Sequence, residues 1–295
     1  MPGHPERPQR LEAAVAGAAM AGAKPLDVEV DEQRALAAIG RVHDPGLAER
    51  LREACRRGPG LFDSPDNPIS EGTFGAAVAA VAAALAAADA LLDGRSECAW
   101  VPVRPPGHHA LRNRAMGFCF FNNVAVTAEE LLARGVGPVA IVDFDVHHGN
   151  GTQEHFWTRS DAYFLSLHHF PFYPGSGSAD EIGAGEGRGF TRNVPLAGGA
   201  DDAIYGEALG MGLDDLLRAV RPQAWLVSAG FDAHVDDPLG GMAVTEAGFA
   251  EFGRLIRGAA GSAPVLAVLE GGYRLDALRS SVQAFLEGLQ DRVTP

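Results

Sequence analysis

Residues 139–151 read Val-Ala-Ile-Val-Asp-Phe-Asp-Val-His-His-Gly-Asn-Gly. An apolar run that ends in turn residues is typical of a strand buried on both faces of a parallel sheet. Polar side chains at its end indicate a site at the carboxyl edge of the sheet, where open α/β folds bind ligands. Alternate side chains of a strand share a face, so we expect Asp143, Asp145 and His147 to project together.

Four further apolar runs are each followed by glycine, histidine, aspartate or tyrosine. We expect them to be strands of the same sheet, at residues 100–103, 162–167, 224–229 and 265–269. Helical segments alternate with them, which is typical of an α/β fold with a mainly parallel central sheet. These helices are expected at residues 11–23, 35–55 with a break at 44–46, 70–94, 123–134, 201–220 and 245–260. Residues 57–70 and 171–199 are expected to be loops, and the length of the second favours a functional role.

The composition is that of an ordinary soluble globular protein, with 46% hydrophobic and 21% charged residues. A formal net charge of −14 argues against a nucleic-acid-binding surface, which needs clustered lysine and arginine, and is compatible with a cationic substrate. Three scattered cysteines form no disulfide framework and indicate a reducing cytoplasm. The N-terminus has no signal-peptide pattern, and residues 76–92 are too weakly hydrophobic to span a bilayer, so we expect no membrane partner.

Histidines occur in an unusual arrangement. Six of the ten form tandem pairs, at positions 108–109, 147–148 and 168–169, and all three pairs lie where predicted strands end. A single histidine is more often structural than catalytic, but this placement favours chemistry for some of them. Borderline and hard metals accept histidine nitrogens and carboxylate oxygens, and a catalytic zinc keeps three protein ligands plus water. Asp145 and His147 supply two such ligands; Asp232, which otherwise reads as a turn or helix-cap residue, is the candidate for the third.

Several separate motifs together resemble the zinc-dependent histone deacetylases. They are Arg104-Pro-Pro-Gly-His-His-Ala110, Gly117-Phe-Cys-Phe-Phe-Asn122, the stretch from Val142 to Thr152, Ser166-Leu-His168, Ser228-Ala-Gly-Phe-Asp232, Asp237-Pro-Leu-Gly-Gly241 and Glu270-Gly-Gly-Tyr273. The match is nearest to class II-like bacterial members and the acetylpolyamine amidohydrolases, and it runs from His4-Pro5-Glu6 to the last helix. The resemblance implies a single catalytic domain over residues 1–295 with the three-layer arginase-deacetylase fold. The chain starts three residues before the His4-Pro5-Glu6 motif, where family members have a strand and loop, so we expect either that the start is trimmed or that this first strand is absent.

The resemblance also implies a catalytic centre. Zn²⁺ would be bound by Asp145, His147 and Asp232, and the hydroxyl of Tyr273 would help the metal to polarise the amide carbonyl and to hold the oxyanion. An enzyme that retains this tyrosine is expected to be active.

The first histidine pair would divide the proton chemistry. His109 resembles the general base and acid of the family, with its ring oriented by Asn150. His108 would pair with the carboxylate of Asp143, which favours its charged form and makes it an electrostatic helper. His148, next to these groups in the sequence, has no catalytic role in this interpretation.

A narrow tunnel would lead the acylated side chain to the metal. Gly117 and Phe118 resemble one wall, and Tyr173 stands where the family usually has the opposing phenylalanine. Asp66 resembles the rim aspartate that clamps backbone amides of the substrate. Leu239 occupies the position of a gatekeeper, and an apolar residue there offers a cation no partner. Acetyl-lysine, or lysine with another short acyl group, is therefore favoured as substrate, with acetylpolyamine as the alternative.

A structural monovalent cation is also implied. Asp143, Asp145, His147, Ser166 and Leu167 resemble the family's potassium site, in part through backbone carbonyl groups. Carbonyl and carboxylate oxygens of this kind suit K⁺.

Two other interpretations remain open. The binuclear manganese ureohydrolases share the fold, and Asp232-Ala-His-Val-Asp236 spells one of their motifs, although here it follows the Asp-x-Asp segment instead of preceding it. The second is a binding module that retains the fold without the chemistry. Within the deacetylase interpretation, His234 is expected to face solvent, and a homo-oligomer is neither required nor excluded by the sequence.

Overall fold

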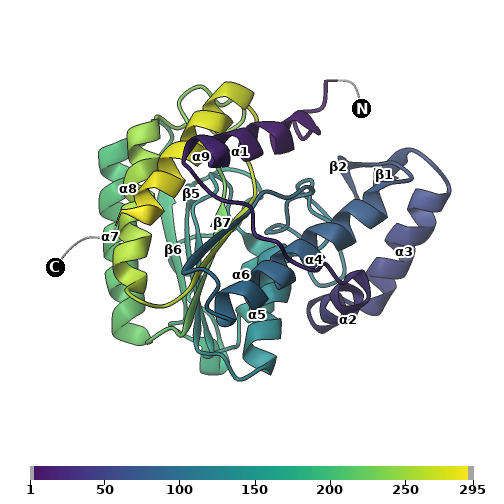
Figure 1. Cartoon of the computed structure of the whole chain (residues 1–295), viewed down its shortest axis with the longest axis horizontal. Helices are drawn as coiled ribbons and strands as arrows, with labels where there is room; N and C mark the ends of the chain where they lie inside the picture. The colour runs from purple at the N-terminus through teal and green to yellow at the C-terminus, as the bar shows by residue number, and fades with distance from the viewer. Residues whose placement is uncertain (1–2, 292–295) are drawn as a thin grey trace.

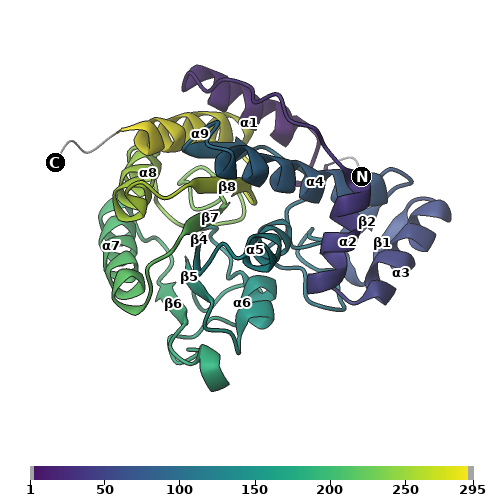
Figure 2. The same ribbon diagram turned by 60° about the horizontal axis from the view of Figure 1, so that its bottom comes forward.

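The computed structural model describes residues 3–291, and its core is a six-stranded sheet in which every neighbouring pair is parallel. The strand order is β3-β8-β7-β4-β5-β6. Figure 1 shows the whole chain, and the run from β8 to β6 can be followed in Figure 2. The strands are β3 (Cys98–Val101), β4 (Val139–Asp143), β5 (Ala162–His169), β6 (Thr191–Leu196), β7 (Ala224–Ala229) and β8 (Val265–Leu269). The predicted parallel α/β fold is therefore confirmed. Strand β4, which carries the apolar run before Asp143, lies inside the sheet between β7 and β5.

Helices cover both faces of this sheet and form the expected three layers (Figure 2). Side chains of β4 alternate between the faces, since Val139 and Ile141 belong to one core cluster while Ala140 and Val142 belong to the other. The first cluster includes residues of α2 (Glu32–Val42), α3 (Pro45–Arg56), α4 (Thr73–Leu92) and α5 (Asn123–Ala133). The second includes residues of α1 (Gln9–Met20), α7 (Asp202–Ala219), α8 (Glu246–Ala260) and α9 (Leu275–Gln290).

Side chains that accept hydrogen bonds from exposed backbone amides mark where several helices begin. Asp31, Asp44, Asn122, Asp201 and Thr245 each stand at the residue before a helix and accept from an amide of its first turn. Such caps satisfy donors that a helix start leaves without an internal partner.

Helix α4 is long and apolar enough to cross a membrane by length and composition alone. About two thirds of its most apolar window is buried inside the protein (67%), where it packs against α2, α5 and β3. It is a core helix in this fold.

The expected loops contain regular structure. Strand β6 and the short 3₁₀ helix Gly185–Gly187 lie within residues 171–199, and a hairpin of β1 (Gly60–Phe62) and β2 (Ser64–Ile69) lies within residues 57–70. Both predictions were wrong because these strands are short and because β2 and β6 carry proline. Proline cannot donate to a strand ladder and is tolerated at sheet edges, where β6 lies with Pro195. A further helix that the sequence did not predict, α6 (Asn150–Phe156), follows the end of β4.

Candidate active site

Two segments that follow neighbouring strands bring the predicted metal ligands together. Asp145 and His147 lie just after β4, and Asp232 lies after β7. One ligand atom from each lies within 4.8 Å of the others. Backbone amides fix the carboxylates, because Asp145 Oδ2 accepts from Gly271 N at 2.8 Å and Asp232 Oδ1 accepts from Val146 N at 3.0 Å.

The donor set of this cluster fits a zinc ion. Asp232 Oδ2 is buried and makes no hydrogen bond, and it lies 3.2 Å from His147 Nδ1. Asp145 Oδ1 lies 3.0 Å from the same nitrogen. Two buried carboxylates and one imidazole that converge in this way match the oxygen and nitrogen ligands of a catalytic zinc site with three protein ligands.

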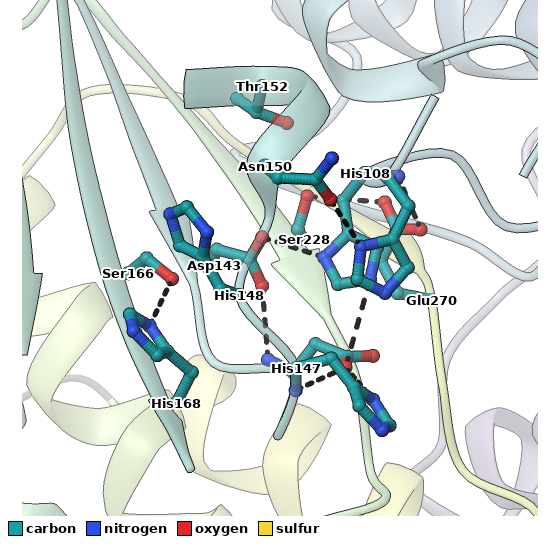
Figure 3. Close-up of polar contacts among 12 residues, drawn as sticks. His108, Asp143, His147, His148, Asn150, Thr152, Ser166, His168, Ser228 and Glu270 are labelled. Atoms are coloured by element: carbon teal, nitrogen blue, oxygen red, sulfur yellow. Dashed lines mark hydrogen bonds and ion pairs between the residues drawn. The ribbon is translucent and has the colours of Figure 1, made fainter. Parts of the chain in front are cut away.

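The tandem histidines 108 and 109 lie beside this cluster and have different partners. His108 Nδ1 donates to Asp143 Oδ2 at 2.9 Å, as Figure 3 shows. His109 Nδ1 lies 2.7 Å from Asn150 Oδ1, at the start of α6. An amide oxygen only accepts hydrogen bonds, so Nδ1 of His109 carries the proton and its Nε2 is free to accept one.

Electrostatics separates the two histidines further. Burial opposes charge on His108, but the carboxylates of Asp143 and Asp145 raise its pKa well above the usual value. Burial and the positive charge of His108 hold the pKa of His109 well below it. Burial raises the pKa of Asp143 to about 6. One imidazole is therefore charged while its neighbour is neutral, with a ring nitrogen free to accept a proton, which is an arrangement suited to acid–base chemistry.

Glu270 holds the loop that presents these histidines, and the sequence did not single it out as a site residue. Its Oε2 accepts from Gly107 N at 2.6 Å and His108 N at 3.2 Å, while Ser228 Oγ donates to Oε1 (Figure 3). Burial raises the pKa of Glu270 to about 7. The signal was present, because Ser228 and Glu270 each stand in a quoted motif at the end of a strand.

Tyr273 is buried, and burial raises the pKa of its hydroxyl well above the usual value, so the phenol keeps its proton. The guanidinium of Arg10 lies 4.8 Å from the ring centroid, and its Nε donates to Gly272 O at 2.6 Å. Asp237 Oδ2 accepts from Tyr273 N at 2.6 Å. Arg10 and Asp237 were not predicted as site residues; Asp237 begins a recognised motif, whereas Arg10 has no local signal.

The predicted tunnel residues lie around this centre. Gly117 and Phe118 both have left-handed backbones, with φ of 58° and 67°, and the Phe118 ring meets that of Tyr273 edge-on at 5.8 Å. Tyr173 presents its ring to His109, with centroids 5.2 Å apart. A Cβ on Gly117 would lie 2.3 Å from His109 Cδ2, so only glycine allows this approach.

The other predicted residues are placed as follows. Leu239 is half-buried and its backbone amide donates to Asp237 Oδ1 at 2.9 Å. Ser166 and Leu167 are fully buried in β5, next to Asp143 of β4. Ser166 Oγ lies 2.9 Å from His168 Nδ1.

Two histidines beyond the first pair have structural partners. His148 lies between Ser176 Oγ at 2.8 Å and Gln153 Oε1 at 3.0 Å. His234 is 3% exposed and stacks on Phe249, so the expectation that it faces solvent was wrong. The motif after β7 folds back as a turn, which turns this ring onto α8 instead of outward.

Comparison with known proteins agrees with this geometry. The family model described as "Histone deacetylase domain" matches residues 4–289. An acetylpolyamine amidohydrolase of Burkholderia pseudomallei is 43% identical over 227 residues, 75% of this chain and 64% of that protein. A histone deacetylase-like amidohydrolase of Pseudomonas aeruginosa is 41% identical over 240 residues, 79% of this chain and 62% of that protein. The chain thus spans somewhat less than two thirds of these relatives.

Solved structures show the same similarity in three dimensions. The HDA15 HD domain superposes with a TM-score of 0.86 at 35% identity, covering 99% of this chain and 83% of that one. The acetylpolyamine aminohydrolase of B. pseudomallei also gives a TM-score of 0.86, at 34% identity, covering 96% of this chain and 90% of that one.

Proposed function

Since the chain belongs to the histone deacetylase family of amidohydrolases, we propose that it uses zinc to remove acetyl or other short acyl groups from lysine side chains. The observation that carries the proposal is the buried Asp145–His147–Asp232 cluster beside two histidines whose pKa values are shifted in opposite directions. A binding module without chemistry would have no need for such a pair.

A zinc ion held by these ligands would polarise the acyl carbonyl and lower the pKa of a bound water to roughly 7. Neutral His109 takes a proton on Nε2, because Asn150 holds its Nδ1 proton. The same nitrogen can then return the proton to the leaving amine. Charged His108 keeps His109 neutral beforehand and helps to balance negative charge as it forms on the carbonyl oxygen.

Tyr273 completes this centre as a neutral hydrogen-bond donor. Its hydroxyl keeps its proton at physiological pH and would donate to the carbonyl oxygen as negative charge develops there. Arg10 holds the ring from one side and Asp237 holds the backbone amide. Asp143 and Asp145 with Ser166, His147 and Leu167 would hold a structural K⁺. The three free cysteines suit a reducing cytoplasm.

Two observations support acetylpolyamine as the alternative substrate. The relatives include acetylpolyamine amidohydrolases, and a net charge of −14 attracts cations. Against this, Leu239 gives a secondary ammonium no acceptor near the tunnel.

Hydrolysis of acetyl-lysine peptides and of N8-acetylspermidine, with metal content measured on the same sample, tests the proposal. We expect one zinc per chain in addition to any monovalent ion, and a higher kcat/KM on the peptides. The opposite ranking would assign the enzyme to polyamines. Two manganese ions per chain would place it with the ureohydrolases instead.

Leu239→Glu should shift the preference toward N8-acetylspermidine, because the new carboxylate gives the ammonium group a partner. The measurement is the ratio of kcat/KM values for the two substrates in the variant and the wild type. Leu239→Gln is the control, because it changes the size and polarity of the side chain without adding a charge. A ratio that Leu239→Glu leaves unchanged would mean that Leu239 does not control this selectivity.

A further inference from the structure

The carboxylate of Asp66, on β2, receives hydrogen bonds from both predicted walls of the tunnel. Its Oδ2 accepts from Gly117 N at 3.1 Å and from Tyr173 Oη at 3.0 Å. Its Oδ1 accepts from Ser64 Oγ. A single side chain therefore connects segments 51 and 107 residues away in the sequence.

The neighbouring residue strengthens one side of this connection. Asn67 Oδ1 accepts from Phe118 N at 2.7 Å, and Asn67 Nδ2 donates to Cys119 O at 3.2 Å. Asp66 and Asn67 thus bind two successive amides, those of the two residues with left-handed backbones. These two amides donate to side chains instead of to a neighbouring strand, so Asp66 and Asn67 hold the backbone at Gly117 and Phe118, the predicted tunnel wall, in place.

The other side of the connection depends on the hydroxyl of Tyr173. Burial and the negative charge of Asp66 raise the pKa of Tyr173, so the phenol keeps its proton and donates it. The ring meets that of His109 edge-on at 5.2 Å while its hydroxyl donates to Asp66, so Tyr173 connects the histidine pair with β2. Tyr173 is 39% exposed, so its hydrogen bond to Asp66 lies at the protein surface, within reach of a substrate.

The acceptor capacity of Asp66 limits what else it can bind. A carboxylate offers about four acceptor positions, and three are occupied by donors of the chain itself. Oδ2 has both of its positions filled. An extended peptide that enters the mouth would need two positions to dock two backbone amides on this carboxylate, and only one is left.

We propose that Tyr173 is a specificity-determining residue whose hydroxyl occupies Asp66, so that the enzyme recognises the acylated alkylamine stem and not the peptide backbone around it. This inference rests on the proposed deacylase function and deepens it. The substrate class is that of N-acyl alkylamines, which includes the acyl-lysine side chain whatever its flanking residues.

Two neutral substrates with the same stem test the proposal: N-acetylpentylamine and an end-capped tripeptide with a central acetyl-lysine. In the wild type we expect their kcat/KM values to agree within about tenfold, since one residual contact to a charged group is a modest gain. Tyr173→Phe frees one position on Asp66 and should raise the peptide-to-pentylamine ratio about fivefold, with KM for the peptide changing more than kcat. Tyr163→Phe is the control, because Tyr163 is 3% exposed in β5; it should leave the ratio unchanged.

The possible outcomes distinguish a failure of the proposed role of Tyr173 from a failure of the proposed deacylase function. A ratio that Tyr173→Phe leaves unchanged, or an equal loss on both substrates, would overturn the role of Tyr173. A wild type that hydrolyses neither substrate would overturn the proposed function instead. In that event, calorimetric dissociation constants of methyl ketone analogues of both substrates still test the inference, and the same fivefold shift toward the peptide analogue is expected.

Discussion

At the scale of single residues, the proposed active site uses two histidines in different protonation states, one charged and one neutral. His108 and His109 are adjacent, and their ring centroids are 4.0 Å apart. Their Nδ1 atoms meet a carboxylate in one case and an amide oxygen in the other. The charge that Asp143 stabilises on the first ring suppresses charge on the second, so the base stays ready at neutral pH.

Tyr273→Phe should lower kcat roughly 10²-fold or more, because the variant loses a donor to the developing oxyanion. KM and zinc content should change little, since the ring and its contact with Arg10 remain. Steady-state kinetics and metal analysis on the same sample check this. Undiminished turnover would remove Tyr273 from the mechanism.

Asn150→Asp should move the acidic limb of the pH profile of kcat/KM upward, by about one pH unit or more. The pKa of His109 lies below its usual value in the wild type, and a carboxylate 2.7 Å from Nδ1 would stabilise the charged ring and raise that pKa. His109 would then become protonated, and inactive as a base, at a higher pH. An acidic limb that stays in place would show that His109 is not the group titrating there.

Prediction from the residues alone brought Asp145 and His147 together because they are two residues apart, although both lie beyond the end of β4. The recognised motifs supplied the more distant pairs His108–Asp143 and His109–Asn150. Arg10 reaches Gly272, 262 residues away, and Glu270 reaches Gly107, 163 residues away. Contacts over such separations depend on strand order and helix packing, which no local pattern encodes.

At the scale of elements, the apolar strands of the parallel sheet were readable, including β3 at one edge, whereas β6 at the other edge and the β1–β2 hairpin were not. Strand β4 is apolar throughout because both faces are covered, so its pattern is unambiguous. Strand β2 belongs to a separate two-stranded sheet, and β6 is an edge strand of the main sheet. Both carry proline and polar residues, so their sequences resemble loops. The hairpin of β1 and β2 nevertheless presents Asp66 to the tunnel, which makes a misread element part of the proposed site.

Gly117→Ala should lower kcat/KM at least about 100-fold, since the new Cβ would meet the His109 ring at 2.3 Å and the positive φ adds strain. Gly135→Ala is the matched control. Gly135 also has a positive φ, of 78°, but nothing lies within 4 Å of the added Cβ. The control should lose roughly 1 kcal/mol of stability and keep its activity. Thermal unfolding and kinetics on both variants distinguish the effect of backbone strain from the displacement of His109. Equal kcat/KM values for Gly117→Ala and Gly135→Ala would contradict the role of Gly117 in positioning His109.

At the scale of the whole molecule, the net charge of −14 should act on cationic substrates over a distance. Raising NaCl from about 50 mM to about 500 mM shortens the screening length and should raise KM for N8-acetylspermidine several-fold. KM for neutral N-acetylpentylamine should change less than about twofold, because it gains nothing from the protein's field. Equal salt dependence for both substrates would show that the excess negative charge lies away from the entrance.

Helix α1 packs along α9, the last helix, with Gly17 against the carbonyl of Arg279 and with the Gln290 side chain bonded to Ala21 O (Figure 1). A ribosome adds about 5–20 residues per second, so the first helix waits roughly 15–60 s for its partner to be synthesised. A nascent chain halted before α9 would contain every proposed catalytic residue. It would leave α1 without the surface of α9, so the hydrogen bonds of Arg10 to the carbonyls of Glu270 and Gly272 would be among the contacts left to hold that helix.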